Sequence, residues 1–280
     1  MATITTLRNR NINLSVLPFY EDISEQNARK WWTYGRIYPL FCKSDGMIPF
    51  FIHTNRDAGQ TLPNSFRVIL YDKNDVQQGY LTDVSSNIVA INDNGKITLQ
   101  YAGGSARVPA SSNGQYYIKV QMIDTLPDTL YEYVSDIFTF VDDITPYLRI
   151  RWWDAHNFDT GNGTIFYEQN YFQNNVYLQA ELAKPEYIFE EEGVNRDGYF
   201  FPIKQISEKR FRFSFFASEY LLDAMRLIRM SDYIRIQANG KTYQPDTFLI
   251  TPTWENEGDV ASVQAEFEIN AIAKKLPTIL

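Results

Sequence analysis

Side chains able to bind metals or act as nucleophiles are scarce in this sequence. It contains two histidines and one cysteine, His53, His156 and Cys42, and about 100 positions separate the histidines. Because a structural zinc site takes four ligands, these three residues cannot supply a standard one. The sequence also lacks a Gly-x-Ser-x-Gly nucleophile turn and a glycine-rich phosphate-binding loop. We therefore expect no catalytic residue, no metal site and no cofactor, and a protein that is not an enzyme.

Two acidic groups could in principle bind a cation or serve acid–base catalysis. Glutamates 190–192 follow Glu186 and Glu181, and calcium prefers several carboxylate oxygens. The Asp-x-Asp-x-Asp-Gly pattern of calcium loops is missing, so a solvated turn or a negative surface that repels nucleic acid is the favoured interpretation. Residues 186–192 are expected to face solvent or a channel. Asp142 and Asp143 are adjacent, and glycoside hydrolysis uses two carboxyl groups roughly 5–10 Å apart. Their place after a predicted strand favours a linker instead.

Two tryptophan pairs could stack on a sugar ring. Trp152 and Trp153 precede Asp154 and His156, and a second pair occupies residues 31–32. Adjacent residues of a strand point to opposite faces of the sheet. We therefore expect one tryptophan of each pair in the core and the other at an interface, since large aromatic residues dominate both environments.

Composition and charge exclude several kinds of partner and cellular setting. The 280 residues carry a formal net charge of −8, with a pI near 4.9. Tight binding to a nucleic-acid backbone needs clustered lysine and arginine, so it is not expected. No apolar run approaches the roughly 20 residues of a membrane span, and the first residues do not resemble a signal peptide. One cysteine allows no intrachain disulfide.

The first half reads as short strands separated by turns. Aromatic residues make up 15% of the chain, and this composition favours strands. The spacing predicts an immunoglobulin-like β-sandwich over residues 1–145, with a short helix near residues 25–32. The expected strands cover residues 37–41, 48–52, 66–71, 88–91, 97–101, 116–123 and 131–140.

The second half, residues 146–280, shows clearer periodicity. Residues 210–215 and 263–269 alternate between apolar and polar side chains, which predicts half-buried strands. Ser218 precedes an apolar stripe of helical spacing, so we expect one helix over residues 218–230. Asn239-Gly240 predicts a tight hairpin. Further strands are expected at residues 147–153, 175–181, 233–237, 241–243 and 247–251.

These elements predict a mainly β protein with two β-sandwich or barrel-like domains. The boundary falls at residues 141–146, where a strand ends in two acids and a Thr-Pro pair. The second domain is expected to carry the flanking helix.

Distinctive strings lie at residues 148–154 (LRIRWWD), 183–192, 197–201, 224–233, 247–254 and 258–261, and in the first half at 30–32, 37–40 and 138–143. Through these strings the chain resembles a group of mostly uncharacterised proteins from tail modules of phages and prophages of gut Bacteroidetes. The resemblance implies a virion structural protein of the tail, baseplate or neck, with a tail-tube-like second domain. It would be assembled in the host cytoplasm and would act by forming homo-oligomeric rings and docking other tail proteins. The chain would line the lumen of the ring or lie on its periphery, and its net negative charge would let DNA pass through the lumen without tight binding. The expected interface residues are Trp152, Trp153, Tyr187, Phe189 and Trp254.

The sequence is also compatible with two other functions. A carbohydrate-binding adhesin for host attachment predicts two or three coplanar exposed aromatic rings in a groove. A glycan- or peptidoglycan-cleaving enzyme predicts a cleft with paired carboxylates, one with a raised pKa.

Overall fold

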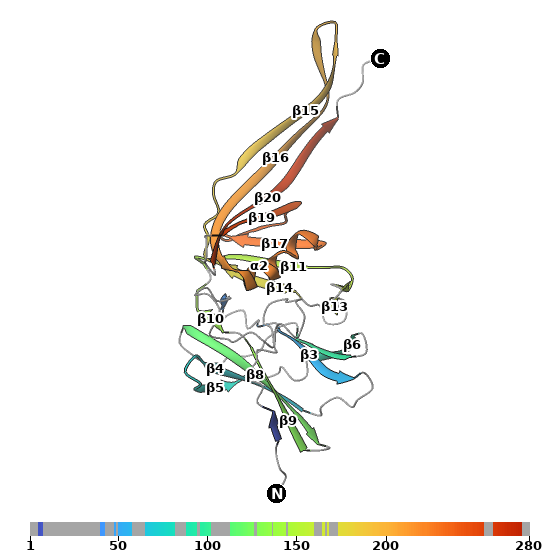
Figure 1. The fold of residues 1–280 in the computed structure, drawn as a ribbon. Coiled ribbons are helices and arrows are strands. Elements are labelled where there is room, and N and C mark those ends of the chain that lie inside the picture. Colours follow the sequence, from blue (N-terminus) through green and yellow to red (C-terminus); the bar gives the residue numbers. More distant parts are fainter. Residues whose placement is uncertain are drawn as a thin grey trace.

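The chain is mostly β with one short α-helix in the part that the structure describes, as predicted (Figure 1). The computed structural model describes residues 5–7, 40–42, 48, 50–57, 65–81, 88–93, 96–101, 113–125, 128–135, 137–143, 145–159, 164–165, 167, 173–254 and 260–275. The helix expected near residues 25–32, and the tryptophan pair within it, lie outside these residues.

A seven-stranded sheet is built on β8 (Gly114–Thr125), which pairs with β4, β9 and β10. Its other strands are β1 (Thr5–Leu7), β2 (Leu40–Cys42), β4 (Ser65–Asp72), β5 (Gln77–Tyr80), β9 (Asp128–Val134) and β10 (Phe138–Val141). A three-stranded sheet contains β3 (Phe50–Asp57), β7 (Lys96–Tyr101) and β6 (Ile88–Asp93). The strands expected at residues 66–71, 88–91, 97–101 and 116–123 are therefore confirmed.

The strand expected over residues 131–140 is divided in two. Its register against β8 shifts by one residue between Val134 and Phe138. Ser135 lies at this break, where its backbone N–H donates to the Ile118 carbonyl and its hydroxyl accepts the Ile118 N–H. This bonding replaces the regular ladder and separates β9 from β10.

The chain after Thr145 forms two four-stranded sheets. One has the order β14 (Asn174–Leu178), β11 (Leu148–Trp153), β17 (Tyr233–Ala238), β18 (Lys241–Tyr243). The predicted Asn239-Gly240 turn joins β17 and β18, with positive φ at both residues. A separate short hairpin joins β12 (Phe158–Asp159) and β13 (Thr164–Ile165).

The other sheet has the order β15 (Glu186–Arg196), β16 (Tyr199–Ser218), β20 (Val260–Lys275), β19 (Thr247–Trp254). The predicted alternation is confirmed, because Phe211, Phe213 and Phe215 are buried on one face of β16 opposite buried residues of β20. Their rings join one core with residues of β11, β14, β17 and the helix. Described strands up to β10 and those from β11 onward pair only within their own group, while the domain division at residues 145 and 146 stays a prediction.

The helix is shorter than predicted. It covers α2 (Glu219–Met225), and a 3₁₀ turn, η3 (Ile228–Met230), follows it. The apolar stripe is correct, since Leu221, Ala224 and Ile228 are all buried. The α-helix ends early because the last turn tightens, with the Met230 N–H bonding the Leu227 carbonyl. Ser218 is the N-cap residue, but its side chain makes no capping hydrogen bond.

The expected turn around glutamates 190–192 is wrong. These residues lie on β15, which pairs with β16 in a long hairpin closed by Asp197-Gly198. Both turn residues have positive φ, 52° and 81°, which a two-residue hairpin turn of this kind requires. The hairpin and the end of β20 project from the rest of the chain (Figure 1). The three glutamates are exposed to solvent in this chain, as expected.

Candidate assembly surface and groove

The five residues predicted as interface contacts lie in different surroundings. Trp152 is fully buried in the core, so its prediction as a surface contact is wrong, although one tryptophan of the pair was expected there. Trp153 lies on the opposite face of β11 and is half-buried. Tyr187 and Phe189 on β15 are 74% and 60% exposed, and Trp254 at the end of β19 is 45% exposed.

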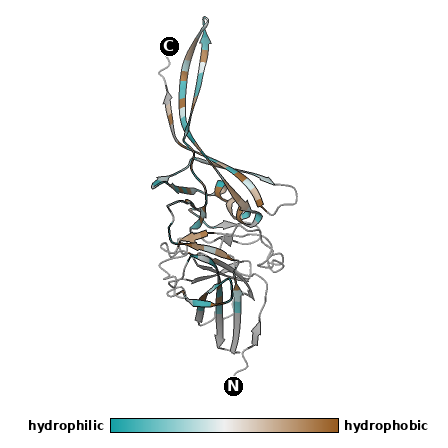
Figure 2. Ribbon diagram, turned by 90° about the vertical axis from the view of Figure 1, so that its left-hand side faces the viewer, coloured by the Kyte–Doolittle hydropathy of each residue, from teal (hydrophilic) through white to brown (hydrophobic). Residues whose placement is uncertain are grey.

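The projecting strands expose more large apolar side chains than the sequence analysis identified. Figure 2 shows hydrophobic and hydrophilic residues interspersed along them. The exposed apolar residues of this region are Tyr187, Phe189, Val194, Tyr199, Phe200, Phe201, Ile203 and Ile272. A concentration of exposed apolar residues on one element is typical of a protein-binding surface.

Ion pairs hold the base of these strands in register. On the face turned away from the core, the Arg210 Nε donates to Glu268 over 2.8 Å, joining β16 to β20. Arg212 bridges β15 and β20, with donor–acceptor distances of 2.7 Å to Glu186 and 3.2 Å to Glu266. Cross-strand pairs of opposite charge stabilise a sheet. Ion pairs therefore join β15, β16 and β20 to one another where the projecting part of the sheet begins.

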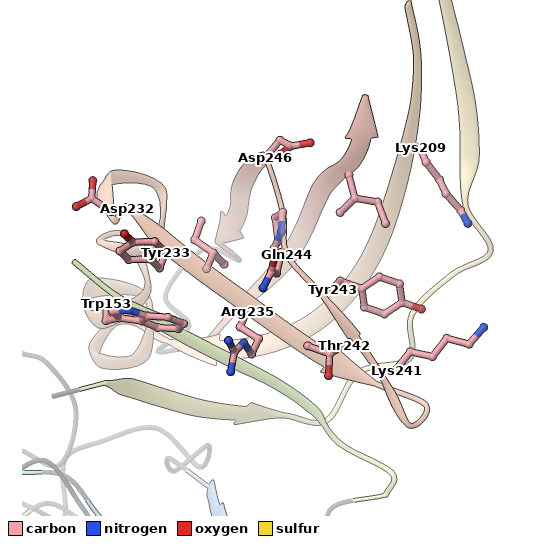
Figure 3. A pocket seen from close by; sticks show the side chains of 13 residues that line it. Trp153, Lys209, Asp232, Tyr233, Arg235, Lys241, Thr242, Tyr243, Gln244 and Asp246 are labelled. Atoms are coloured by element: carbon pink, nitrogen blue, oxygen red, sulfur yellow. The ribbon is translucent and has the colours of Figure 1, made fainter. Parts of the chain in front are cut away.

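A groove of about 1340 Å³ lies beside that base, between β17, β18 and the start of the projection. Figure 3 shows the ring of Trp153 under that of Tyr233, with Arg235 alongside. The two ring centroids are 5.4 Å apart with an interplanar angle of 17°, and the Arg235 guanidinium lies 5.4 Å from the Trp153 ring centre. The remaining polar lining includes Asp232, Lys241, Thr242, Gln244 and Asp246.

The groove has aromatic and hydrogen-bonding groups that suit a polar ligand. Its aromatic rings do not form the coplanar platform expected of an adhesin, because Trp153 and Tyr233 cover each other. Tyr243 instead packs against the core rings of Phe211 and Phe267. A smaller apolar cavity of about 350 Å³, between α2 and β19, is lined by Trp254, Leu222 and Leu249 among others.

Near the groove, Asp154 and Asp232 each accept a hydrogen bond from a backbone N–H of the other's loop. The Asp232 N–H donates to Asp154 Oδ1 over 2.7 Å, and the Ala155 N–H donates to Asp232 Oδ2 over 3.0 Å. Burial raises the pKa of Asp154, and the negative charge of Asp232 adds to this rise. Each carboxylate accepts a backbone N–H, so the pair fixes the loop after β11 against the start of β17.

Replacing Asp154 with asparagine should raise the melting temperature at pH 7. The amide oxygen of the new side chain can still accept the Asp232 N–H, whereas the charge of the half-buried carboxylate and its repulsion with Asp232 disappear. Since the folded pKa is raised, the ionised carboxylate destabilises the fold once the pH exceeds the ordinary aspartate value. We expect a gain of about 1–2 °C at pH 7 that vanishes near pH 4, measured by thermal unfolding.

The matched control is Asp143→Asn, which makes the same chemical change with the opposite expected sign. Asp143 accepts hydrogen bonds from the Thr145 hydroxyl and N–H, which lower the pKa of Asp143. Its ionised form therefore supports the fold at neutral pH. A lower melting temperature for Asp154→Asn at pH 7 would contradict the role given to Asp154.

Asp143 thus accepts hydrogen bonds within its own loop, and the linker interpretation of residues 142–143 stays a prediction. Over the described ranges, no group of three or more histidine, cysteine or carboxylate side chains is placed to hold a metal ion. No helix among the described residues is long and apolar enough to span a bilayer. Comparison of the chain with protein-family models and with curated proteins gives no match.

Sequence reasoning missed most of the projecting surface. Phe200, Phe201 and Ile272 were not predicted as surface contacts, because exposed apolar residues do not produce the regular alternation of apolar and polar positions that marks a strand with one buried face. The Asp197-Gly198 pair was the available signal for the hairpin, since Asp-Gly between apolar runs favours a tight turn.

Proposed function

We propose that this chain is a structural protein of a bacteriophage tail, which assembles with copies of itself into a ring and docks other tail proteins. The observation that carries the proposal is the projecting part of β15, β16 and β20, with its exposed aromatic residues. A monomer gains nothing from exposing these side chains to water, whereas an assembly would bury them.

The resemblance of the sequence to tail-module proteins supplies the biological setting of the proposal. In that setting the protein is a virion component of the tail, assembled in the host cytoplasm. The net charge of −8 suits a ring through which DNA passes, because like charges oppose tight binding of the phosphate backbone.

Purified protein should form closed rings as its concentration rises. The measurement is light-scattering mass over a concentration series, with negative-stain microscopy of the same samples. A mass corresponding to about six or more chains, together with ring images, is the expected result. A monomeric mass at every concentration would contradict self-assembly by this chain.

A glycan-binding adhesin is the second candidate, favoured by the size and the polar lining of the groove although its rings form no coplanar platform. Specific glycan binding that is lost in Tyr233→Ala, together with a monomeric mass, would replace the assembly proposal with this one.

A further inference from the structure

The projecting part of the sheet formed by β15, β16, β20 and β19 has two unpaired strand edges, one on each side of the same segment. Strand β19 begins at Thr247, which pairs with Glu268 of β20. From this pair toward the end of the projection, the sheet contains only β15, β16 and β20. Strand β16 lies between the other two. Among the described strands, none pairs with the outer edge of β15, and none pairs with the outer edge of β20 beyond Glu268, the edge that faces away from β16. Unpaired strand edges are ready templates for another chain.

The charges on these edges are opposite. Strand β15 carries glutamates 190–192, and β20 ends in Lys274 and Lys275. The register through β16 places Glu191, Gln205 and Lys274 on one level. It places Glu192, Lys204 and Lys275 on the next level. One edge is thus acidic where the other is basic.

The apolar residues match in the same way. Phe189 and Ile272 both pair with Ser207, so they occupy one level on opposite edges. Both side chains are mostly exposed. Inside one chain, β16 separates the two edges by two strand spacings, roughly 10 Å, so the matching residues cannot meet directly.

We propose that β15 of one copy pairs with the β20 end, residues 269–275, of a second copy. This proposal rests on the self-assembly proposed above and names the surfaces that perform it. Both strands run antiparallel to β16, so copies in the same orientation bring them together as parallel neighbours. At this junction residues 191 and 192 of one copy take register positions beside residues 274 and 275 of the other, and Phe189 takes the position beside Ile272.

Charge also selects against other pairings of the same edges. Two copies joined through β15 alone would place glutamates against glutamates, and two joined through β20 would place lysines against lysines. Like charges directly opposite one another destabilise paired strands. Each copy therefore uses one edge of each kind, and such head-to-tail contacts close into a ring where the rotation permits.

Charge reversal tests the junction in the full-length chain. Glu191→Lys with Glu192→Lys makes both edges basic, and Lys274→Glu with Lys275→Glu makes both acidic. Each double variant should raise the concentration for half-assembly at least about tenfold, since like-charge contacts cost several kcal/mol. An equimolar mixture of the two variants should assemble again, because every junction then joins opposite charges. The chain with all four reversals should also recover assembly.

The control is Arg67→Glu with Lys73→Glu, which changes the net charge as the Lys274 and Lys275 reversal does, at exposed positions away from both edges and from the groove. This control should assemble like the unmodified chain. Unimpaired assembly of either edge variant, or no recovery in the mixture and the fourfold variant, would overturn the junction and leave self-assembly standing. Failure of the unmodified chain to assemble would overturn both proposals.

Discussion

Replacing Trp152 with alanine should lower the free energy of unfolding by about 3–5 kcal/mol. Trp152 is the largest fully buried side chain of the described residues, and it lies in the core shared by the two C-terminal sheets and α2. Removing the indole loses its burial and leaves a cavity that rigid neighbouring strands cannot fill. Chemical denaturation followed by circular dichroism would measure the loss.

Trp153→Ala is the matched control, since it removes the same side chain one residue along the strand. Trp153 is half-buried and contacts the Tyr233 ring and Arg235. Losing these contacts should cost about 1 kcal/mol. Equal losses for the two variants would contradict the assignment of Trp152 to the core and Trp153 to the groove.

This contrast shows what the sequence could reveal about the pair. The period of two places neighbouring tryptophans on opposite faces, but it does not tell which face is covered. That choice depends on Ile150 and Ile236, which extend the buried face of β11 and β17 around Trp152. The covering sheet comes from distant segments, so burial could be assigned only once the fold was known.

Strands with one buried face were the most predictable elements. Phe211, Phe213 and Phe215 alternate with polar residues because one face of β16 packs in the core and the other meets water. Asn239-Gly240 was equally clear, since few residue types accept two successive positive φ values. Local chemistry determines both features, so a single sequence displays them.

The projecting strands were harder to predict because both of their faces are exposed. Without a buried face, Glu190, Glu191 and Glu192 can follow one another on a strand, and this run resembles a solvated turn. The match between these glutamates and Lys274 and Lys275 depends on the register through β16. More than 80 residues separate the two groups in sequence, so no local pattern connects them.

Replacing Gly193 with alanine should loosen the outer half of the projecting hairpin and leave the core unchanged. A Cβ atom at this position would collide with the Phe201 carbonyl oxygen and lie 2.7 Å from the Phe200 ring. The register of β15 on β16 shifts at this glycine, where the Phe200 ring packs over the bare backbone. Because backbone and ring must both move, the pairing above residue 193 should open more often.

Hydrogen exchange measures this effect residue by residue. Amides of residues 194–201 and of Ile203 should exchange at least about tenfold faster in Gly193→Ala, whereas those of residues 211–217 should keep their rates. Val194→Ala is the control, because it alters an exposed neighbour and introduces no collision. Unchanged exchange in the hairpin would contradict the close packing at Gly193. Faster exchange throughout β16 would show instead that the outer hairpin and the core strands open as one unit.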